Sequence, residues 1–305
     1  MDGWPALAHT PDVCGSNISI FAALLAAGAV LVPHAASAVV GGTTVRANDE
    51  ARAWTVKVEA QRGPLCSGVA IEPTLVLTAA HCVLGARAYS ISVLDGQMRR
   101  RTIPVASVRP HESFLPGRTP DTQPGVDLAI LRLASPLPDG IRPVRLGGGI
   151  GAGDTVTIAG FGLGQEGRSA TARTLRQSTL LAAGAYTSGN RVMVAVDATT
   201  LGEATGAGAC RGDSGGPIMR GAPGSDELVG IVSWSSGPAR QRVRQVCGGF
   251  TAITPIADHR VWIDSTVAAI KSEPLPTRSE ARAGRRANAP QPAPSMPSDL
   301  PSRPD

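Results

Sequence analysis

Short runs of apolar and β-branched residues, separated by clusters of Gly, Pro and Asp, follow one another along most of the chain. Such runs predict strands, and many short strands at close spacing are typical of all-β sandwiches and barrels. We therefore expect an all-β fold of two packed antiparallel β-barrels. Its strands include Trp54-Thr55-Val56-Lys57-Val58, Ile91-Ser92-Val93-Leu94, Val192-Met193-Val194-Ala195-Val196 and Leu228-Val229-Gly230-Ile231-Val232.

One helical pattern stands near the C-terminal end. Ile256, Ile263, Val267 and Ile270 recur at spacings of 7, 4 and 3 residues, which places them on one face of a helix. Thr254-Pro255 offers an N-cap and a proline at the first helical position. We expect the apolar face of this C-terminal α-helix to pack against the second barrel.

Both ends of the chain differ from the part between them. Residues 18–33 form an apolar run that is too short and too rich in Gly and Ala for a membrane span, and Ala36-Ser37-Ala38 follows as a small-residue cleavage site. Residues 1–38 are therefore interpreted as a signal peptide. No Lys or Arg precedes Arg46, so an uncleaved anchor is the alternative. Residues 272–305, with eight prolines and five arginines, are expected to form a disordered tail.

Composition and charge narrow the class of protein. Of the 305 residues, 42% are hydrophobic and 17% are charged, which indicates a globular chain. The net charge of +5 is mild, and part of it lies in the tail without aromatic residues, so we expect no nucleic-acid partner. We expect a monomer that meets the membrane only transiently, through its signal segment.

The cysteines indicate an oxidising compartment. Cys14 would leave with the signal peptide, and the four that remain can pair in three ways. No His/Cys spacing resembles a zinc site and no acidic cluster resembles a calcium loop. We therefore expect no metal and no cofactor.

Residues 210–217 read Cys-Arg-Gly-Asp-Ser-Gly-Gly-Pro, with Ser214 among glycines. A serine hydroxyl is a weak nucleophile that needs a base within reach and donors for the oxyanion that forms on attack. His81 ends the apolar run that begins at Leu75, and Asp127 precedes the run at residues 128–133. The chain order His, Asp, Ser is one of the known orders of a catalytic triad, so these three residues are predicted to be catalytic.

These segments resemble the chymotrypsin/trypsin family of serine endopeptidases. The matching segments are Thr78-Ala79-Ala80-His81-Cys82, Asp127-Leu128-Ala129 and Gly212-Asp213-Ser214-Gly215-Gly216-Pro217, together with Val39-Val40-Gly41-Gly42 at the family's mature start. The resemblance covers residues 39–271, which we expect to form one protease domain of two β-barrels. It implies a secreted or periplasmic enzyme of bacterial type that acts on proteins or peptides.

The resemblance also implies roles for further residues. The amides of Gly212 and Ser214 would form the oxyanion hole, and Arg211 would face its rim. Cys66 would pair with Cys82, and Cys210 with Cys247. Asp213 would accept the new α-ammonium of Val39 after processing, so that a single cut after Ala38 could activate the enzyme without a separate zymogen stage.

The specificity pocket carried over from the family lacks a charge. Its floor corresponds to Gly208, with Ala209 beside it, and its walls correspond to Ser235 and Gly248. The strand Ser233-Trp234-Ser235 would bind the substrate backbone. We therefore expect an apolar residue before the scissile bond. Arg/Lys specificity, with an acid such as Glu203 reaching the pocket, is the alternative.

Two other functions compete with this prediction. A non-catalytic binding protein could use the same fold, because fold does not dictate function. A periplasmic quality-control protease would share the chemistry, but such proteins resemble Gly-Asn-Ser-Gly-Gly at the nucleophile, whereas this chain has Asp213 there.

Overall fold

Six strands form a closed antiparallel barrel in the N-terminal half of the computed structural model, which describes residues 39–274 except 62, 85–87, 223 and 242. The strand order is β2-β3-β4-β7-β6-β5, and β2 closes the ring by pairing with β5. Alternate residues point inward, and the interior is filled by side chains such as Val56, Val58, Val76, Ile91 and Leu131. The strands are β2 (Thr55–Ala60), β3 (Leu65–Glu72), β4 (Leu75–Thr78), β5 (Tyr89–Leu94), β6 (Arg100–Pro110) and β7 (Ala129–Leu133).

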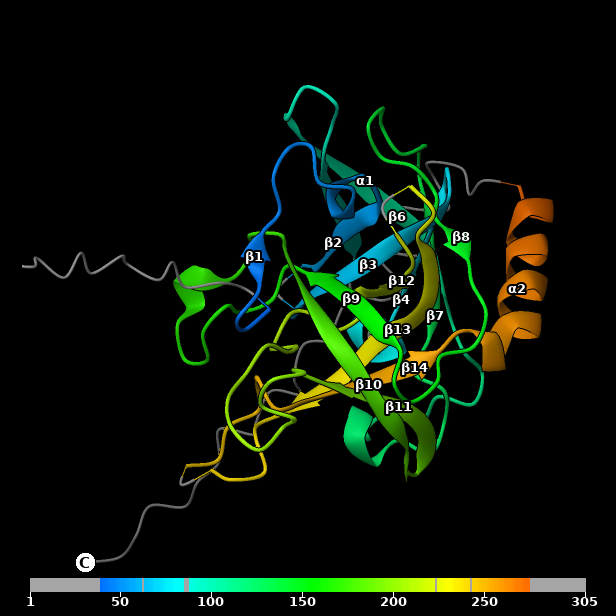
Figure 1. Cartoon of the computed structure of the whole chain (residues 1–305). Helices are drawn as coiled ribbons and strands as arrows, with labels where there is room; N and C mark the ends of the chain where they lie inside the picture. The colour runs from blue at the N-terminus through cyan, green and yellow to red at the C-terminus, as the bar shows by residue number, and fades with distance from the viewer. Residues whose placement is uncertain (1–38, 62, 85–87, 223, 242, 275–305) are drawn as a thin grey trace, which may run out of the picture. The chain divides into compact units, whose positions relative to one another are not determined.

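A second ring of six antiparallel strands follows, in the order β10-β11-β14-β13-β12-β9, and the β10–β9 pairing closes it. The strands are β9 (Thr155–Gly160), β10 (Arg176–Ser188), β11 (Asn190–Val196), β12 (Pro217–Arg220), β13 (Glu227–Ser236) and β14 (Phe250–Pro255). Two short strands extend this sheet: β1 (Thr43–Thr44) on β10 and β8 (Arg145–Leu146) parallel to β13. The prediction of an all-β fold with two antiparallel barrels is confirmed (Figure 1).

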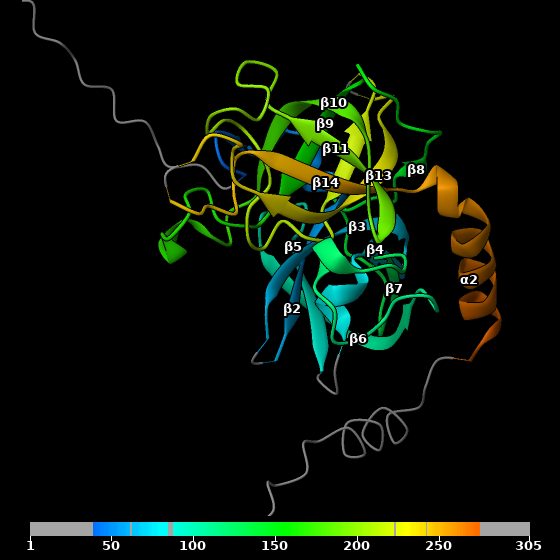
Figure 2. The same ribbon diagram turned by 90° about the horizontal axis from the view of Figure 1, so that it is seen from below.

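A shared apolar cluster joins the two barrels. It combines Leu77 and Ile130 of the first barrel with Met219 and Ile231 of the second. Helix α2 (Arg260–Ser272) covers this cluster with its buried residues Ile263 and Ile270, and it runs along one side of both barrels (Figure 2). The helix therefore packs against both barrels, and not against the second barrel alone as the sequence predicted. The other helical segments are short: α1 (Ala51–Trp54) and the 3-10 turns η1 (Ala80–Val83), η2 (Pro120–Thr122), η3 (Ser169–Thr171) and η4 (Ala257–His259).

The C-terminal helix begins later than the sequence predicted. Thr254 and Pro255 are the last residues of β14, where they pair with Ile231 and Gly230 of β13. A proline at the end of a strand needs no N–H for the ladder, so the strand can use the residues that also suit a helix start. Ile256 is buried but precedes the helix, which starts at Arg260.

The described residues continue slightly past the expected boundary at residue 271. Helix α2 ends at Ser272, and Glu273 accepts two hydrogen bonds from Arg109, at 2.7 and 3.0 Å. Arg132 donates to the carbonyl oxygens of Glu273 and Pro274, at 2.9 and 3.2 Å. The predicted signal peptide and the tail beyond Pro274 lie outside the described residues. Within the described residues, no helix is long and apolar enough to cross a membrane.

Candidate active site

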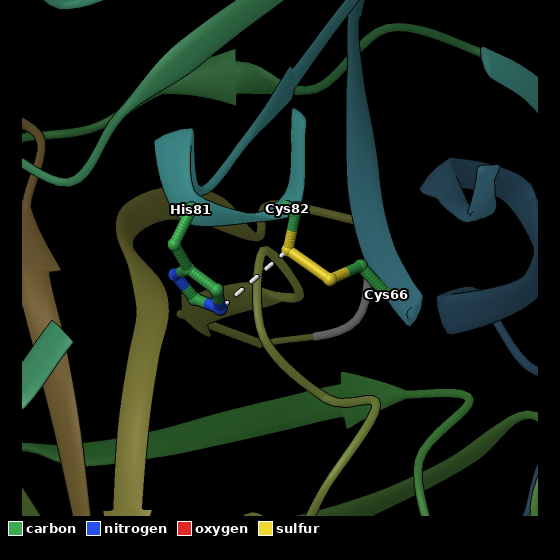
Figure 3. Close-up of side chains that lie close together, drawn as sticks. All are labelled: Cys66, His81 and Cys82. Atoms are coloured by element: carbon green, nitrogen blue, oxygen red, sulfur yellow. Dashed lines mark hydrogen bonds between the residues drawn. A yellow bond between two sulfur atoms is a disulfide. The ribbon is translucent and has the colours of Figure 1, made fainter. Parts of the chain in front are cut away.

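His81 lies at the point where the two barrels meet. Strand β4 is fully buried between β3 and β7, and the 3-10 turn η1 that follows it carries His81 (Figure 3). The neighbouring Ala79 and Ala80 are completely buried, while about a fifth of the His81 side chain is exposed. The apolar run therefore anchors the turn and leaves the imidazole accessible.

Asp127 is completely buried two residues before the start of β7 and holds His81 by two contacts. One carboxylate oxygen accepts the backbone N–H of His81 at 3.0 Å, and the other lies 2.8 Å from Nδ1 of the ring. The hydroxyl of Ser233 donates to that second oxygen at 2.6 Å. Burial alone would raise the pKa of Asp127, but the charge of His81 and the hydrogen bonds from His81 and Ser233 outweigh it and lower that pKa.

Two glycines shape the turn around Ser214. Gly212 has φ of +102° and Gly215 has φ of +79°, values that side chains with a Cβ rarely adopt. A Cβ on Gly212 would approach Cα of Gly162 to 2.8 Å, and one on Gly215 would collide with Thr78 Oγ1. The glycines are therefore required by both backbone conformation and space.

The amides of the turn point to an oxyanion site. Within the described residues, the backbone N–H groups of Gly212 and Ser214 donate to no other protein atom. The carbonyl groups of the same two residues are held by Ser67, whose Oγ donates to Gly212 at 2.9 Å and whose N–H donates to Ser214 at 2.8 Å. Ser67 thus holds the turn through its carbonyl groups, and the N–H groups of Gly212 and Ser214 remain available to a ligand.

The hydroxyl of Ser214 is not yet directed at His81. It donates to the carbonyl oxygen of Ser233 at 3.3 Å, and no hydrogen bond joins Ser214 and His81 in the described structure. Nε2 of His81 instead lies 3.7 Å from Sγ of Cys82 (Figure 3). Contacts of this kind are often long without substrate, and a rotation of the serine side chain can redirect its hydroxyl.

Asp213 directly precedes Ser214 in the nucleophile turn, and its carboxyl group is completely buried. Its two oxygens accept the N–H groups of Gly162, at 2.8 Å, and Cys210, at 2.9 Å. Complete burial raises the pKa of Asp213 to about 7, although these two hydrogen bonds and the charge of Arg176 act in the opposite direction. A cation placed beside this carboxyl group would stabilise its ionised form.

Val39 is fully buried in the apolar cluster of the second barrel. Its neighbour Val40 forms an isolated antiparallel bridge with Gly208, whose N–H donates to the Val40 carbonyl at 3.0 Å. Gly208 begins the segment that leads through Cys210 to Asp213. The expected mature start of the chain therefore lies against the segment that carries the buried carboxyl.

The residues predicted for the specificity pocket come together around Gly248. A Cβ on Gly208 would lie 3.4 Å from Cα of Gly248, and the N–H of Ala209 donates to Oγ1 of Thr251 at 3.0 Å. Ser235 turns its hydroxyl to the carbonyl of Val246, at 2.7 Å.

The acid that the sequence offered as an alternative charge for this pocket, Glu203, already has a partner. Glu203 is more than half exposed and forms an ion pair with Arg240 at 2.7 Å. A separate hollow of about 410 Å³ lies beside Trp234 and contains none of the predicted floor or wall residues; its lining is mostly apolar and includes Tyr186, Val194 and Phe250. Arg211 is exposed.

Sequence reasoning missed three polar residues that shape the site. The hydroxyl of Ser233 orients Asp127, although the sequence suggested only a backbone role for that strand. Asp197 accepts the N–H groups of Thr199 and Ala207 and so closes the loop before Gly208. Glu166 accepts the N–H of Val246 at 3.0 Å from a distant loop. Glu166 has no local signal, because its partner lies 80 residues away. The contact of Asp197 with Thr199 is local and of the kind that Asp forms in turns, but the contact with Ala207 depends on the loop closing.

Both disulfides join the pairs that the resemblance implied, Cys66–Cys82 and Cys210–Cys247. The described residues contain one group with metal-ligand atoms close together, formed by Cys66, His81 and Cys82 (Figure 3). Because the two sulfurs are bonded to each other, this group offers no thiolate ligand.

Comparisons with known proteins agree with this geometry. A family model described as trypsin matches residues 39–259. Trypsin beta of Drosophila erecta is 28% identical over 76% of this chain and 90% of its own length. Human serine protease 56 is 32% identical over 79% of this chain and 40% of its own length.

Solved structures show the same fold. Mouse neuropsin, a serine protease, superposes with a TM-score of 0.59 at 25% identity, over 75% of this chain and 99% of its own. The structure titled HBP gives a TM-score of 0.57 at 23% identity, over 75% of this chain and 96% of its own. The named relatives come from insects and mammals, so the expectation of a bacterial type is not supported. The chain belongs to the trypsin family and is a serine endopeptidase.

Proposed function

We propose that this serine endopeptidase cleaves peptide bonds through an acyl-enzyme on Ser214, with His81 as the base and Asp127 as its orienting acid. The observation that carries the proposal is the buried Asp127 carboxylate, which forms hydrogen bonds with both His81 and Ser233. It lies beside the Ser214 turn, in which two backbone N–H groups have no protein acceptor among the described residues. A binding protein on this fold would have no need for that combination.

In the first step, Ser214 Oγ attacks the scissile carbonyl carbon while its proton passes to Nε2 of His81. The carbonyl oxygen becomes an oxyanion, which the N–H groups of Gly212 and Ser214 receive. The C–N bond then breaks as His81 returns the proton to the leaving amine. Water then attacks the acyl carbonyl carbon while its proton passes to Nε2 of His81. The ester bond to Ser214 Oγ breaks as His81 returns that proton to the serine, and the acid is released.

Protonation of Asp127 should not limit activity at mildly acidic pH. The pKa of Asp127 is lowered, so the carboxylate stays ionised well below neutral pH, whereas a protonated His81 cannot accept the serine proton. We expect kcat/KM to fall about tenfold per pH unit on the acidic side, with a single ionisation. A pH profile of kcat/KM that falls with the square of the proton concentration would contradict an ionised Asp127.

We propose that the pocket favours an apolar residue before the scissile bond. Gly208 brings no charge to the floor, and Glu203 is already paired with Arg240 at the surface. A buried Arg or Lys of the substrate would lack a partner, which is costly. The names of the trypsin relatives favour the alternative of Arg/Lys specificity, whereas these pocket residues favour Leu, Met or Phe.

A panel of peptide anilides that differ only in the residue before the scissile bond tests both the activity and this preference. We expect kcat/KM for Leu, Met or Phe to exceed that for Arg or Lys by about 10- to 100-fold. Gly208→Asp should raise turnover of the Arg and Lys substrates, since a Cβ at this position meets only ordinary contacts, and Gly208→Asn is the uncharged control. A preference of the wild-type enzyme for Arg or Lys would overturn the uncharged-floor proposal, and no turnover of any substrate would favour the binding protein.

We further propose that the enzyme is secreted or periplasmic, monomeric, and processed between Ala38 and Val39 by the signal peptidase alone. Val39 has φ of +50°, which is unusual for a β-branched residue and strains the backbone. This torsion angle is defined through the peptide bond to Ala38, so cleavage of that bond removes the constraint. The same cleavage creates an α-ammonium on a buried residue whose neighbour Val40 already pairs with Gly208, five residues before Asp213.

A further inference from the structure

Three cationic side chains surround one carboxylate on the outside of the first barrel. Glu59 lies 3.0 Å from Lys57, 3.2 Å from Arg100 and 2.6 Å from Arg173. We call these four residues the cationic surface. One negative charge faces three positive ones, so the group keeps an excess of positive charge.

The two arginines of the cationic surface remain largely exposed. The side chains of Arg100 and Arg173 are 61% and 63% exposed, and each contacts Glu59 through a single nitrogen. A guanidinium has five N–H donors, so most of them still face solvent. Glu59 fixes the position of the groups without using up their capacity, which lowers the entropic cost of binding an anion.

The cationic surface lies beside the nucleophile turn. Glu59 of β2 is directly opposite Leu65 of β3, so the two side chains share one face of the barrel. Leu65 Cδ2 is 3.3 Å from the position a Cβ would take on Gly212. Arg173 reaches the same region from the second barrel, where its N–H donates to the carbonyl of Phe161 at 2.8 Å. The N–H of Phe161 in turn donates to Ser67, the residue that holds the turn.

This position defines the part of a substrate that would meet the cationic surface. The residues before the scissile bond are assigned to Ser233-Trp234-Ser235 on β13, in the second barrel. The cationic surface centres on β2 and β6 of the first barrel, whose strands form a separate group in Figure 2. A substrate that runs along β13 and crosses Ser214 therefore continues past Gly212 and Leu65 toward Glu59.

We propose that the cationic surface selects substrates with acidic residues in the segment that follows the scissile bond. Arg100 and Arg173 would bind Asp or Glu side chains by charge-assisted, two-point hydrogen bonds, the geometry that guanidinium and carboxylate groups favour. The inference rests on the proposed function, because it needs Ser214 as the cleavage point.

Matched peptides test the selection. They share the residues before the scissile bond and differ after it, with two or three Asp or Glu residues, the corresponding Asn or Gln residues, or Lys. For the wild-type enzyme at low ionic strength we expect kcat/KM for the acidic peptide to exceed that for the amide peptide about 5- to 10-fold. The ratio should fall toward one at about 0.5 M salt, because the contacts are exposed and screened.

Charge changes in the cationic surface should reverse the order. Arg100→Glu with Arg173→Glu should make the Lys peptide the preferred substrate, and Arg100→Gln with Arg173→Gln should abolish the preference if the first pair does not fold. Arg260→Glu is the control, because Arg260 is an exposed arginine in an ion pair with Asp264 on helix α2. The control should keep the wild-type ratio.

The outcomes separate this inference from the proposed function. An anilide substrate has no residue after the scissile bond, so its turnover by the wild-type enzyme reports the proposed function alone. If the anilide is cleaved but acidic and amide peptides react equally at low salt, the inference is overturned. It is also overturned if Arg260→Glu changes the ratio as much as the double variants do. Binding of a sulfated polysaccharide through Arg100 and Arg173, without peptide selection, would assign the surface to a different partner.

Discussion

Ser214→Ala is expected to abolish peptide hydrolysis while it leaves the fold intact. The hydroxyl makes one hydrogen bond of 3.3 Å to the carbonyl of Ser233, so its removal costs little packing. The new covalent bond of the acyl-enzyme, by contrast, cannot form without it. Loss of a triad member typically reduces the rate by about 10⁴ to 10⁶, and the oxyanion donors retain a residual rate.

Turnover of a peptide anilide and labelling with a fluorophosphonate measure this effect independently. The wild-type enzyme should be labelled at Ser214, and the alanine variant should not. Ser265→Ala removes an exposed hydroxyl from helix α2 and should retain both activity and label. Circular dichroism and the intact disulfides would establish that the inactive variant is folded. A Ser214→Ala variant with nearly wild-type turnover would remove this residue from the mechanism.

Much of the fold was predictable because the strands are short, apolar and buried. Residues 228–232 lie within β13, and residues 192–196 lie within β11. The helix start was not predictable in the same way. The local sequence at Thr254 and Pro255 suits a helix N-terminus. In the structure these residues pair with β13 instead, a partner that is distant in the sequence.

In the candidate site, too, the residues in local motifs were predictable and the residues with distant partners were not. His81, Asp127 and Ser214 stand in motifs, and the structure brings His81 and Asp127 within 2.8 Å of each other. The hydroxyl of Ser233 and the carboxylate of Glu166 form hydrogen bonds with partners more than 70 residues away, so no local sequence pattern predicts these contacts. The orientation of Ser214 was also beyond the sequence, because a hydroxyl rotamer depends on the acceptors that surround it.

The buried carboxyl group of Asp213 should make the stability of the unprocessed protein depend on pH. With the chain continuous through Val39, the pKa of Asp213 is raised to about 7 by burial. In the unfolded chain this carboxyl ionises near pH 4, so between about pH 4 and 7 the folded form binds more protons than the unfolded form. The free energy of unfolding of the unprocessed protein should therefore decrease as pH rises through this window, by up to about 4 kcal/mol.

Processing should reverse the role of this carboxyl. A Val39 ammonium beside Asp213 favours the ionised form and lowers its pKa, so the contribution of Asp213 to the mature protein is present at neutral pH and is lost on acidification. The unprocessed and processed forms should thus show opposite slopes of unfolding free energy against pH. Denaturant unfolding at several pH values measures both, with a variant blocked at Ala38 as the unprocessed form.

Asp213→Asn should accordingly act in opposite ways on the two forms. In the mature enzyme it leaves a buried ammonium without its charge partner, which typically costs about 3 to 5 kcal/mol and should disorder the turn that presents Gly212 and Ser214, so that activity is nearly lost. In the unprocessed form it should remove the decline in stability between about pH 4 and 7, since the titrating group is gone. N-terminal sequencing must give Val39 for the active protein. A stable, fully active enzyme that begins well upstream of Val39, or an Asn variant with wild-type activity, would refute the pairing.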